Sequence, residues 1–166
     1  MSAQGAEIVS LAREWVGTPY VHQAACKGAG CDCLGLLRGI WRQVHGGEPE
    51  HVPAYSKDWS EPQGEERLWQ AALRHLVEKP LTQAAVGDVI LFRMRASAVA
   101  KHLGVQSVVG FAEQRSGAAR PIGRAHGGNG SKFIHAYSGH GVVESPLSPP
   151  WQRRIVARFH FPEETV

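Results

Sequence analysis

At 166 residues the chain is long enough for one domain that buries roughly two-thirds of the surface its unfolded form would expose. A hydrophobic content of 43% and a charged content of 20% describe a globular protein rather than a disordered one. The net charge of +3 is too small to indicate a nucleic-acid partner, and no apolar run approaches the roughly 20 residues that insertion into a membrane requires.

The N-terminal seven residues carry neither a basic start nor an apolar core. We therefore expect no secretion signal and a cytoplasmic location at synthesis. Three cysteines within eight positions cannot all pair with one another, which favours a reduced compartment over a disulfide framework.

Three helices are expected in the first half of the chain. Apolar residues at helical spacing predict a helix that ends at Gly17, a second that begins near Cys33 and ends at residues 46–47, and a third that closes before Pro80. Their buried faces are Ile8, Leu11, Ala12 and Trp15; Leu37, Ile40, Trp41 and Val44; and Trp69, Ala72, Leu73 and Leu76. Residues 18–32 and 48–64 are expected to be loops.

The second half of the chain is expected to be rich in strands. A turn at Gly87-Asp88 precedes the apolar run 89–92, and shorter candidate strands follow at 103–109, 132–135, 141–144 and 154–160. Helices followed by strands predict an α+β fold, with helices packed on one side of a mainly antiparallel sheet. Residues 110–130 hold six glycines and three arginines without periodicity, so we expect an exposed, mobile loop there.

The segment 27–38 (KGAGCDCLGLLR) places Cys33 where a loop becomes a helix. The unpaired N–H groups of a helix start favour thiolate over thiol, which would activate this cysteine as a nucleophile. His102 and His135 follow on separate expected strands, and an imidazolium near the sulfur would stabilise the thiolate further. One cysteine with histidines downstream indicates nucleophilic catalysis.

Five pieces of the sequence, in this order, resemble the NlpC-type family of papain-like cell-wall cysteine peptidases. They are WVGTPY at 15–20, GCDCLGL at 30–36, GDVILF at 87–92, HLGV at 102–105 and FIHA at 133–136. The resemblance implies one peptidase domain over 1–166 that needs no metal or other cofactor. It also implies a substrate, the bond between D-glutamate and a diamino acid in peptidoglycan stem peptides.

The same resemblance suggests a role for each site residue. Cys33 would be the nucleophile, His102 the general base and His135 the polar residue that orients it. Tyr20 would lie near the oxyanion, beside the backbone N–H of the cysteine. Asp32 is expected to cap the helix, with contact to a substrate amine as the alternative.

Two features depart from the family pattern. Leu34 follows the proposed nucleophile where relatives usually carry a serine that contacts substrate, so the preference for stem peptides is in question. The two histidines are also 33 positions apart, because residues 110–130 intervene as a surface insertion. The arginines of that insertion, Arg115, Arg120 and Arg124, would either meet substrate carboxylates or belong to a solvated loop.

Residues 136–147 and 149–155 resemble a narrower branch, the peptidases encoded beside tail genes of phages and gene transfer agents. This likeness implies tail proteins as partners, and action on the cell wall after lysis or as part of a phage-like particle.

Several alternatives remain open at this point. One is amidase or acyltransferase chemistry on the same scaffold, and another is a tail protein with a vestigial site. His22, Cys26, Cys31 and Cys33 form a weak zinc-like pattern, and Cys26 or Cys31 is a candidate for a transient disulfide with Cys33. His126 and His140 are near enough in sequence to replace His135.

Overall fold

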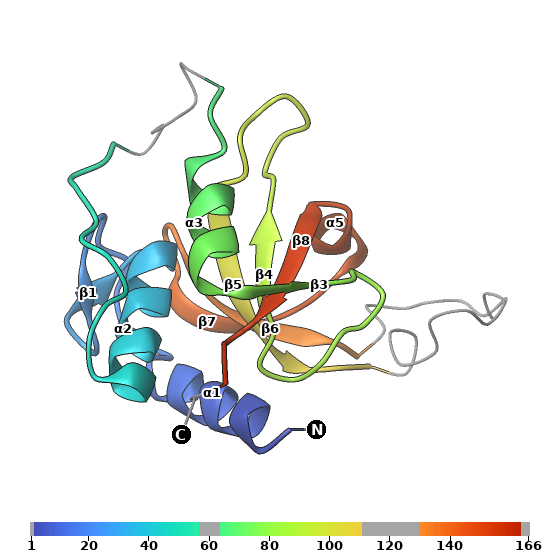
Figure 1. The fold of residues 1–166 in the computed structure, drawn as a ribbon, viewed down its shortest axis with the longest axis horizontal. Helices are drawn as coiled ribbons and strands as arrows, with labels where there is room; N and C mark the ends of the chain where they lie inside the picture. The colour runs from blue at the N-terminus through green and yellow to red at the C-terminus, as the bar shows by residue number, and fades with distance from the viewer. Residues whose placement is uncertain (1, 57–63, 111–129, 164–166) are drawn as a thin grey trace, which may run out of the picture.

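The computed structural model describes residues 2–56, 64–110 and 130–163. Its helices are α1 (Ala3–Glu14), α2 (Cys33–His45), α3 (Arg67–His75) and α5 (Pro149–Gln152) (Figure 1). Its strands are β1 (Ala25–Cys26), β2 (Gly30–Cys31), β3 (Val77–Lys79), β4 (Val89–Phe92), β5 (His102–Val108), β6 (Lys132–Tyr137), β7 (Gly141–Pro146) and β8 (Ile155–His160). β1 and β2 form a small hairpin, and the other strands form one antiparallel sheet in the order β3-β8-β4-β5-β6-β7.

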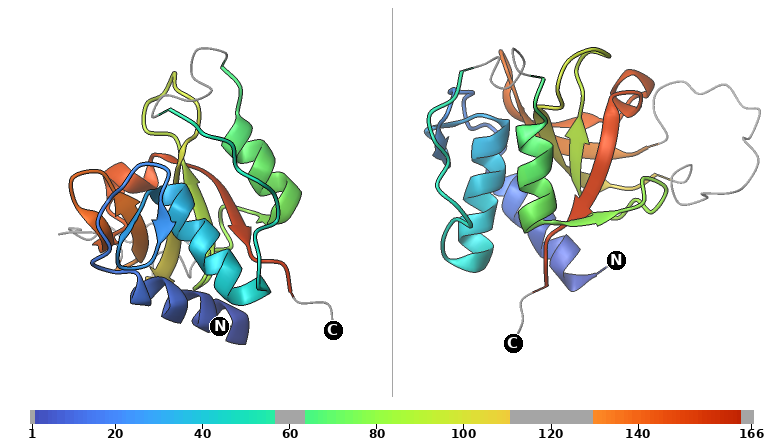
Figure 2. Two further views of the ribbon diagram at one scale, coloured as in Figure 1. Left: turned by 90° about the vertical axis from the view of Figure 1, so that its left-hand side faces the viewer. Right: turned by 45° about the horizontal axis from the view of Figure 1, so that its top comes forward.

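The larger core lies between the sheet and the first three helices. Apolar side chains of α1, α2 and α3 pack there against alternate residues of the central strands, and Figure 2 shows α2 and α3 on the same side of the sheet. The opposite face of the sheet carries a smaller cluster of Ile90, Phe92, Phe133 and Leu147, against which Trp151 of α5 packs. The predicted α+β class with an antiparallel sheet is therefore confirmed.

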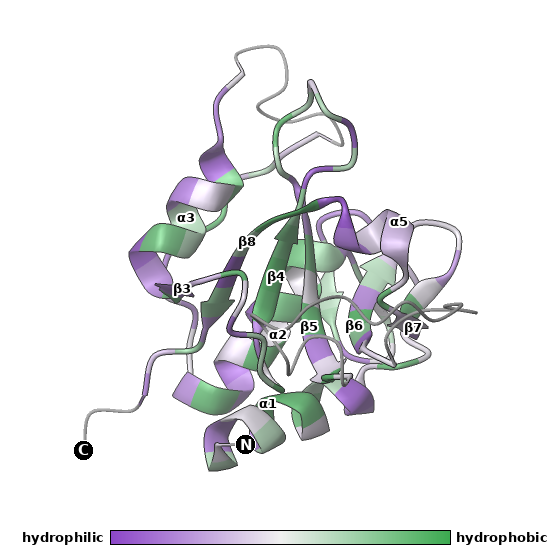
Figure 3. Ribbon diagram, turned by 90° about the vertical axis from the view of Figure 1, so that its right-hand side faces the viewer, coloured by the Kyte–Doolittle hydropathy of each residue, from purple (hydrophilic) through white to green (hydrophobic). Residues whose placement is uncertain are grey.

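The central strand β4 explains why the sheet holds together. Its four side chains are all buried, as its continuous apolar sequence predicts, and Figure 3 shows it as hydrophobic along its length. The alternation of its side chains supplies both clusters, with Leu91 on the helix side and Phe92 on the other. Because both faces of β4 are buried, this strand is a fixed support for the neighbouring strand β5, which pairs with it.

A buried ionic network joins the sheet to the turn before β4. The Arg158 guanidinium, 1% exposed, donates to an Asp88 carboxylate oxygen at 3.0 Å and also to the side-chain oxygen of Gln106. Lys79 of the edge strand donates to the second Asp88 oxygen at 2.9 Å. A buried charge is tolerated only when it is paired and hydrogen-bonded, so this network fixes the pairing of β3, β8 and β5.

Most of the predicted elements are present, with three corrections. Leu73, expected on the buried face of the third helix, is 51% exposed. The third helix ends at His75, because Leu76 is already extended and residues 77–79 add an edge strand to β8. The expected loop 18–32 contains the hairpin of β1 and β2. Residues 111–129 lie outside the described part of the chain, and so does most of the predicted insertion, with its three arginines and His126. Within the described ranges no helix has the length and apolar character needed to cross a membrane.

Candidate active site

Cys33 is the first residue of α2, and the preceding residue caps that helix. The Asp32 carboxylate accepts a hydrogen bond from the Gly35 backbone N–H at 2.7 Å, which satisfies one of the unpaired donors of the helix start. A Cβ at Gly35 would lie 1.8 Å from the Ala24 carbonyl oxygen, so only glycine lets the hairpin loop close onto the helix here. The local sequence thus fixes the position of the cysteine closely.

Asp32 is 3% exposed and serves more than the cap. Its other carboxylate oxygen accepts from the Gln23 backbone N–H at 2.7 Å and from the Tyr55 hydroxyl, and lies 3.8 Å from Nδ1 of His22. Protein donors therefore already hold both oxygens, and the structure places Asp32 as the cap of α2 and an anchor for the segment around Tyr55.

A pocket of about 240 Å³ opens in front of the cysteine. Four of the five predicted site residues line it: Tyr20, Asp32, Cys33 and His102. The rest of the wall is His22, Leu34, Tyr55, Ser56, Leu68, Met94, Lys101, Ala136, Tyr137 and Ser138. The fifth predicted residue, His135, lies behind His102, so the fold brings all five to one place.

The two histidines form a hydrogen-bonded chain that ends on a serine. Nε2 of His102 lies 2.8 Å from Nδ1 of His135, and Nε2 of His135 lies 3.0 Å from the Ser145 hydroxyl oxygen. If His135 donates to Ser145, its Nδ1 must accept from His102, which leaves the lone pair of His102 on Nδ1. In this tautomer His102 can act as a base through Nδ1.

Aromatic rings enclose the two histidines on the face of the sheet opposite α2. The Trp151 indole lies 5.5 Å from the His102 ring and 5.1 Å from the His135 ring, between centroids. Phe133 lies 4.1 Å from the His135 ring. The exposed fractions of His102 and His135 are only 8% and 1%, so the pair is held rigidly and largely away from water.

This burial determines the protonation states of His102 and His135 in the absence of substrate. Burial, with the His135 and Arg154 charges adding to it, lowers the pKa of His102 to about 3. Burial and the charge of His140 lower the pKa of His135 to about 4. Both imidazoles are therefore neutral at neutral pH.

The expectation of a preformed thiolate is wrong for the free site. Burial, followed by the Asp32 charge, raises the pKa of Cys33 to about 12, although the backbone N–H groups of Leu103, Leu34 and Cys33 itself act in the opposite direction. The helix start thus makes the predicted contribution, but desolvation and the capping carboxylate outweigh it. The thiol donates a hydrogen bond of 3.5 Å to the Lys101 carbonyl oxygen, directly before His102.

Tyr20 keeps its hydroxyl proton over the physiological range. Burial, followed by the negative charges of Cys33, Asp32 and Cys31, raises the pKa of its phenol to about 12. A short backbone bridge to Cys31 holds the tyrosine beside the start of α2. Its hydroxyl is therefore a hydrogen-bond donor on the wall of the thiol pocket.

Three residues of the site escaped the sequence analysis. Ser145, Trp151 and Tyr55 each complete a contact that depends on pairing between distant segments, and no local pattern marks them.

Cys26 is exposed, Cys31 is buried, and both are free thiols. Across the described ranges no group of three His, Cys, Asp or Glu side chains is arranged to hold a metal ion, so the zinc-like pattern does not assemble there.

The fold and the position of this site define a papain-like α+β domain of the NlpC/P60 type. The sequence profile described as "NlpC/P60 family" matches residues 17–159, and the chain belongs to this family. Among curated proteins, none is similar enough in sequence to count as a relative.

Solved structures of low sequence identity share the fold. The NlpC/p60 domain of the peptidoglycan hydrolase SagA is 20% identical with a TM-score of 0.56, and the match covers 95% of this chain and 98% of that one. An NlpC/P60 family protein from Bacillus cereus is 18% identical with a TM-score of 0.59, over 97% of this chain and 41% of its own. NlpC1 from Trichomonas vaginalis is 15% identical with a TM-score of 0.57, and the match covers 97% of this chain and 45% of that one. The chain spans less than half of the latter two.

Proposed function

We propose that this protein is a cysteine peptidase that hydrolyses peptidoglycan stem peptides at the bond between D-glutamate and a diamino acid. The observation that carries the proposal is the shared pocket of Cys33 and His102, with His102 held from behind by His135. Membership of the NlpC/P60 family supports it, as does the likeness to the domain of SagA, which is named a peptidoglycan hydrolase.

The proposed reaction begins with the thiol and the imidazole both neutral. As the Cys33 sulfur attacks the scissile carbonyl carbon, its proton passes to Nδ1 of His102, and the imidazolium then protonates the departing amine. A thioester acyl-enzyme remains. Water attacks the thioester, its proton returns through His102 to the sulfur, and the free carboxylate leaves.

Two donors are proposed for the negative charge that develops on the carbonyl oxygen. The backbone N–H of Cys33 lies at the positive end of α2, and the Tyr20 hydroxyl stands on the same pocket wall with its proton retained. Loss of one oxyanion donor typically costs about 3–4 kcal/mol of barrier, so Tyr20→Phe should lower kcat by two orders of magnitude or more.

The test uses diaminopimelate-type muropeptides and mass spectrometry of the products. The intact protein should cut after D-glutamate, Cys33→Ala should not, and Cys26→Ala should cut normally because Cys26 is an exposed thiol outside the pocket. Cleavage between the glycan and the first amino acid would instead support the amidase alternative. If all three proteins leave every muropeptide intact, the peptidase proposal fails and the vestigial-site alternative is favoured.

We propose tail-associated delivery as a separate point, carried only by the sequence likeness of residues 136–147 and 149–155 to tail-encoded peptidases. Purified phage-like particles from the source strain should contain the chain when their proteins are identified by mass spectrometry. Its absence from particles that hold all their other tail proteins would remove this part of the proposal.

A further inference from the structure

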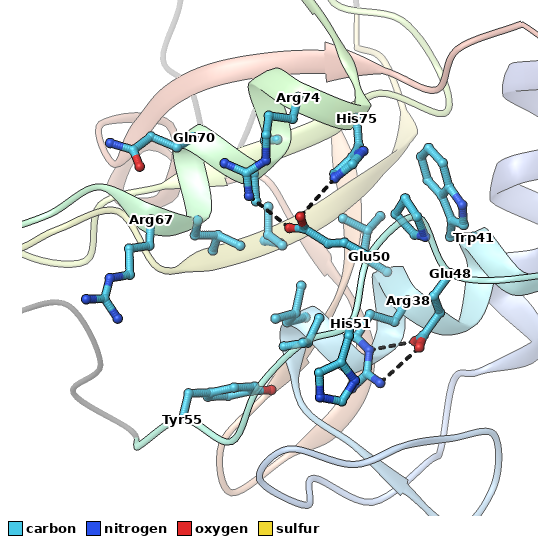
Figure 4. Close-up of a pocket in the computed structure, with 18 of the residues that line it drawn as sticks. Arg38, Trp41, Glu48, Glu50, His51, Tyr55, Arg67, Gln70, Arg74 and His75 are labelled. Atoms are coloured by element: carbon cyan, nitrogen blue, oxygen red, sulfur yellow. Dashed lines mark hydrogen bonds and ion pairs between the residues drawn. The ribbon is translucent and has the colours of Figure 1, made fainter.

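A second and larger cavity lies next to the thiol pocket. Its volume is about 530 Å³, within the range of roughly 300–1,000 Å³ that is usual for small-molecule sites. It is lined by residues of α2, of α3 and of the connecting segment 48–56 (Figure 4). Leu103 of β5 also contributes to the lining.

Much of the lining of this cavity is apolar, although it also contains charged and polar side chains. The apolar part includes Leu34, Leu37, Trp41, Val52, Leu68, Ala71, Ala72, Leu76 and Leu103, which come from both helices, the connecting segment and the sheet. Several of these side chains also belong to the main core, so the cavity continues the core toward the surface.

The charged groups of the lining pair with one another. Arg38 donates to Glu48 at 2.6 Å, and Arg74 donates to Glu50 at 2.9 Å, as Figure 4 shows. Arg67, the third arginine of the lining, donates to Glu65 at 2.9 Å. The arginine charges are thus matched by carboxylates, which does not favour a strongly ionic occupant.

The cavity adjoins the thiol pocket and shares part of its wall. Leu34, Tyr55, Ser56 and Leu68 line both spaces, and Leu34 directly follows Cys33. A group attached near the carbonyl that Cys33 attacks would have to pass these shared side chains to enter the larger cavity.

We propose that the larger cavity is a substrate subsite for an uncharged, apolar chain, such as a long alkyl or acyl group, carried close to the bond that Cys33 attacks. The inference rests on the proposed function, because the cavity is a subsite only if Cys33 reacts. The inference adds a second requirement: the preferred substrate carries this apolar group in addition to a stem peptide. Leu34, beside the proposed nucleophile, presents an apolar side chain to this substrate group, whereas a serine at that position would present a hydroxyl.

The test compares N-methylmaleimide, N-butylmaleimide and N-octylmaleimide as thiol reagents on the intact protein. Modification of Cys33 and Cys26 is followed in one sample by peptide mass spectrometry, so exposed Cys26 reports the intrinsic reactivity of each reagent. The ratio of the Cys33 rate to the Cys26 rate should rise at least about tenfold from methyl to octyl, the gain expected from burying about two of the added methylenes.

Matched variants on α3 locate the effect. Ala71 lines the cavity, and Ala71→Phe should abolish most of the chain-length gain, as should the smaller change Ala71→Leu if the phenylalanine variant does not fold. Leu73, 51% exposed on the same helix, lies outside the lining, and Leu73→Phe should keep the gain.

The outcomes separate this inference from the function that it rests on. If the Cys33-to-Cys26 ratio stays flat across the three reagents while Cys33 reacts readily, the subsite does not exist and the peptidase proposal stands. The inference would also be overturned if the Cys33-to-Cys26 ratio rose from methyl to octyl by the same factor in Ala71→Phe as in the intact protein. If Cys33 reacts with none of the reagents and no muropeptide is cut, both proposals fail together.

Discussion

The buried histidine pair predicts a loss of stability in mild acid. His102 and His135 have pKa values of about 3 and about 4 in the folded protein, against about 6.5 for an unfolded histidine. Below about pH 6.5 the unfolded chain therefore binds protons that the folded chain does not. The free energy of unfolding must then fall as the pH falls from about 6.5 toward the folded pKa values.

The size of the effect follows from these values. Between pH 7 and pH 5 an unfolded histidine becomes almost fully protonated, whereas each folded one stays neutral, which costs about 2 kcal/mol of stability per group. The pair together should cost about 4 kcal/mol, a large part of the roughly 5–15 kcal/mol that stabilises a typical domain.

The measurement is urea denaturation at pH 7, 6 and 5, followed by far-UV circular dichroism. The intact protein is compared with the double variant His102→Gln/His135→Gln, in which amides preserve some of the hydrogen bonding but do not titrate. Carboxylates and the other histidines contribute equally to both proteins, so the difference between the two curves isolates the buried pair.

The double variant should lose about 4 kcal/mol less than the intact protein between pH 7 and pH 5. Parallel curves for the two proteins would refute the reasoning, because they would mean that the pair is solvated or already protonated near neutrality.

Three further predictions use the same structure. Asp32→Asn removes the negative charge beside the sulfur and should lower the pKa of Cys33, which would be read as faster iodoacetamide alkylation at fixed pH. Trp151→Leu opens one side of the histidine pair to water and should raise the pKa of His102 toward its ordinary value, as followed by NMR titration of the imidazole. Asp88→Asn removes the carboxylate to which the buried Arg158 donates and should cost about 3–5 kcal/mol in urea denaturation, whereas Glu14→Gln, in an exposed pair, should leave the denaturation curve nearly unchanged.

Periodicity and capping predict much of this fold because they act over a few residues. The start of α2 at Cys33 follows from the Asp32 cap, and its end follows from Gly46 in the left-handed region with φ of 82°. The strand β4 follows from its apolar run. The strand β3 could not be predicted in this way, because its sequence Val-Glu-Lys is short and polar, and only pairing with β8 makes it extended.

The sequence singled out five candidate site residues that the structure brings together, but it did not predict their electrostatics. A cysteine at a helix start and two histidines on strands can be found along the chain. Whether the thiol ionises depends on how much water reaches it and on which charges stand nearby, and these are properties of packing. Trp151, from the other end of the chain, packs against His102. The Asp32 cap places a carboxylate beside the Cys33 sulfur. The helix start lowers the pKa of Cys33 as predicted, but burial and this carboxylate raise it by more.

Asp32 connects the stability of this site to its reactivity. Its carboxylate caps α2 and accepts a hydrogen bond from the Tyr55 hydroxyl, and Tyr55 lies on the wall that the two cavities share. The same charge raises the pKa of Cys33, so the group that builds the site also keeps its thiol protonated. In the proposed reaction, loss of the thiol proton would therefore accompany attack on the substrate, with Nδ1 of His102 as the acceptor. In the proposed peptidase, such a site would keep the Cys33 thiol protonated, and therefore less reactive toward other electrophiles, until a substrate carbonyl is bound.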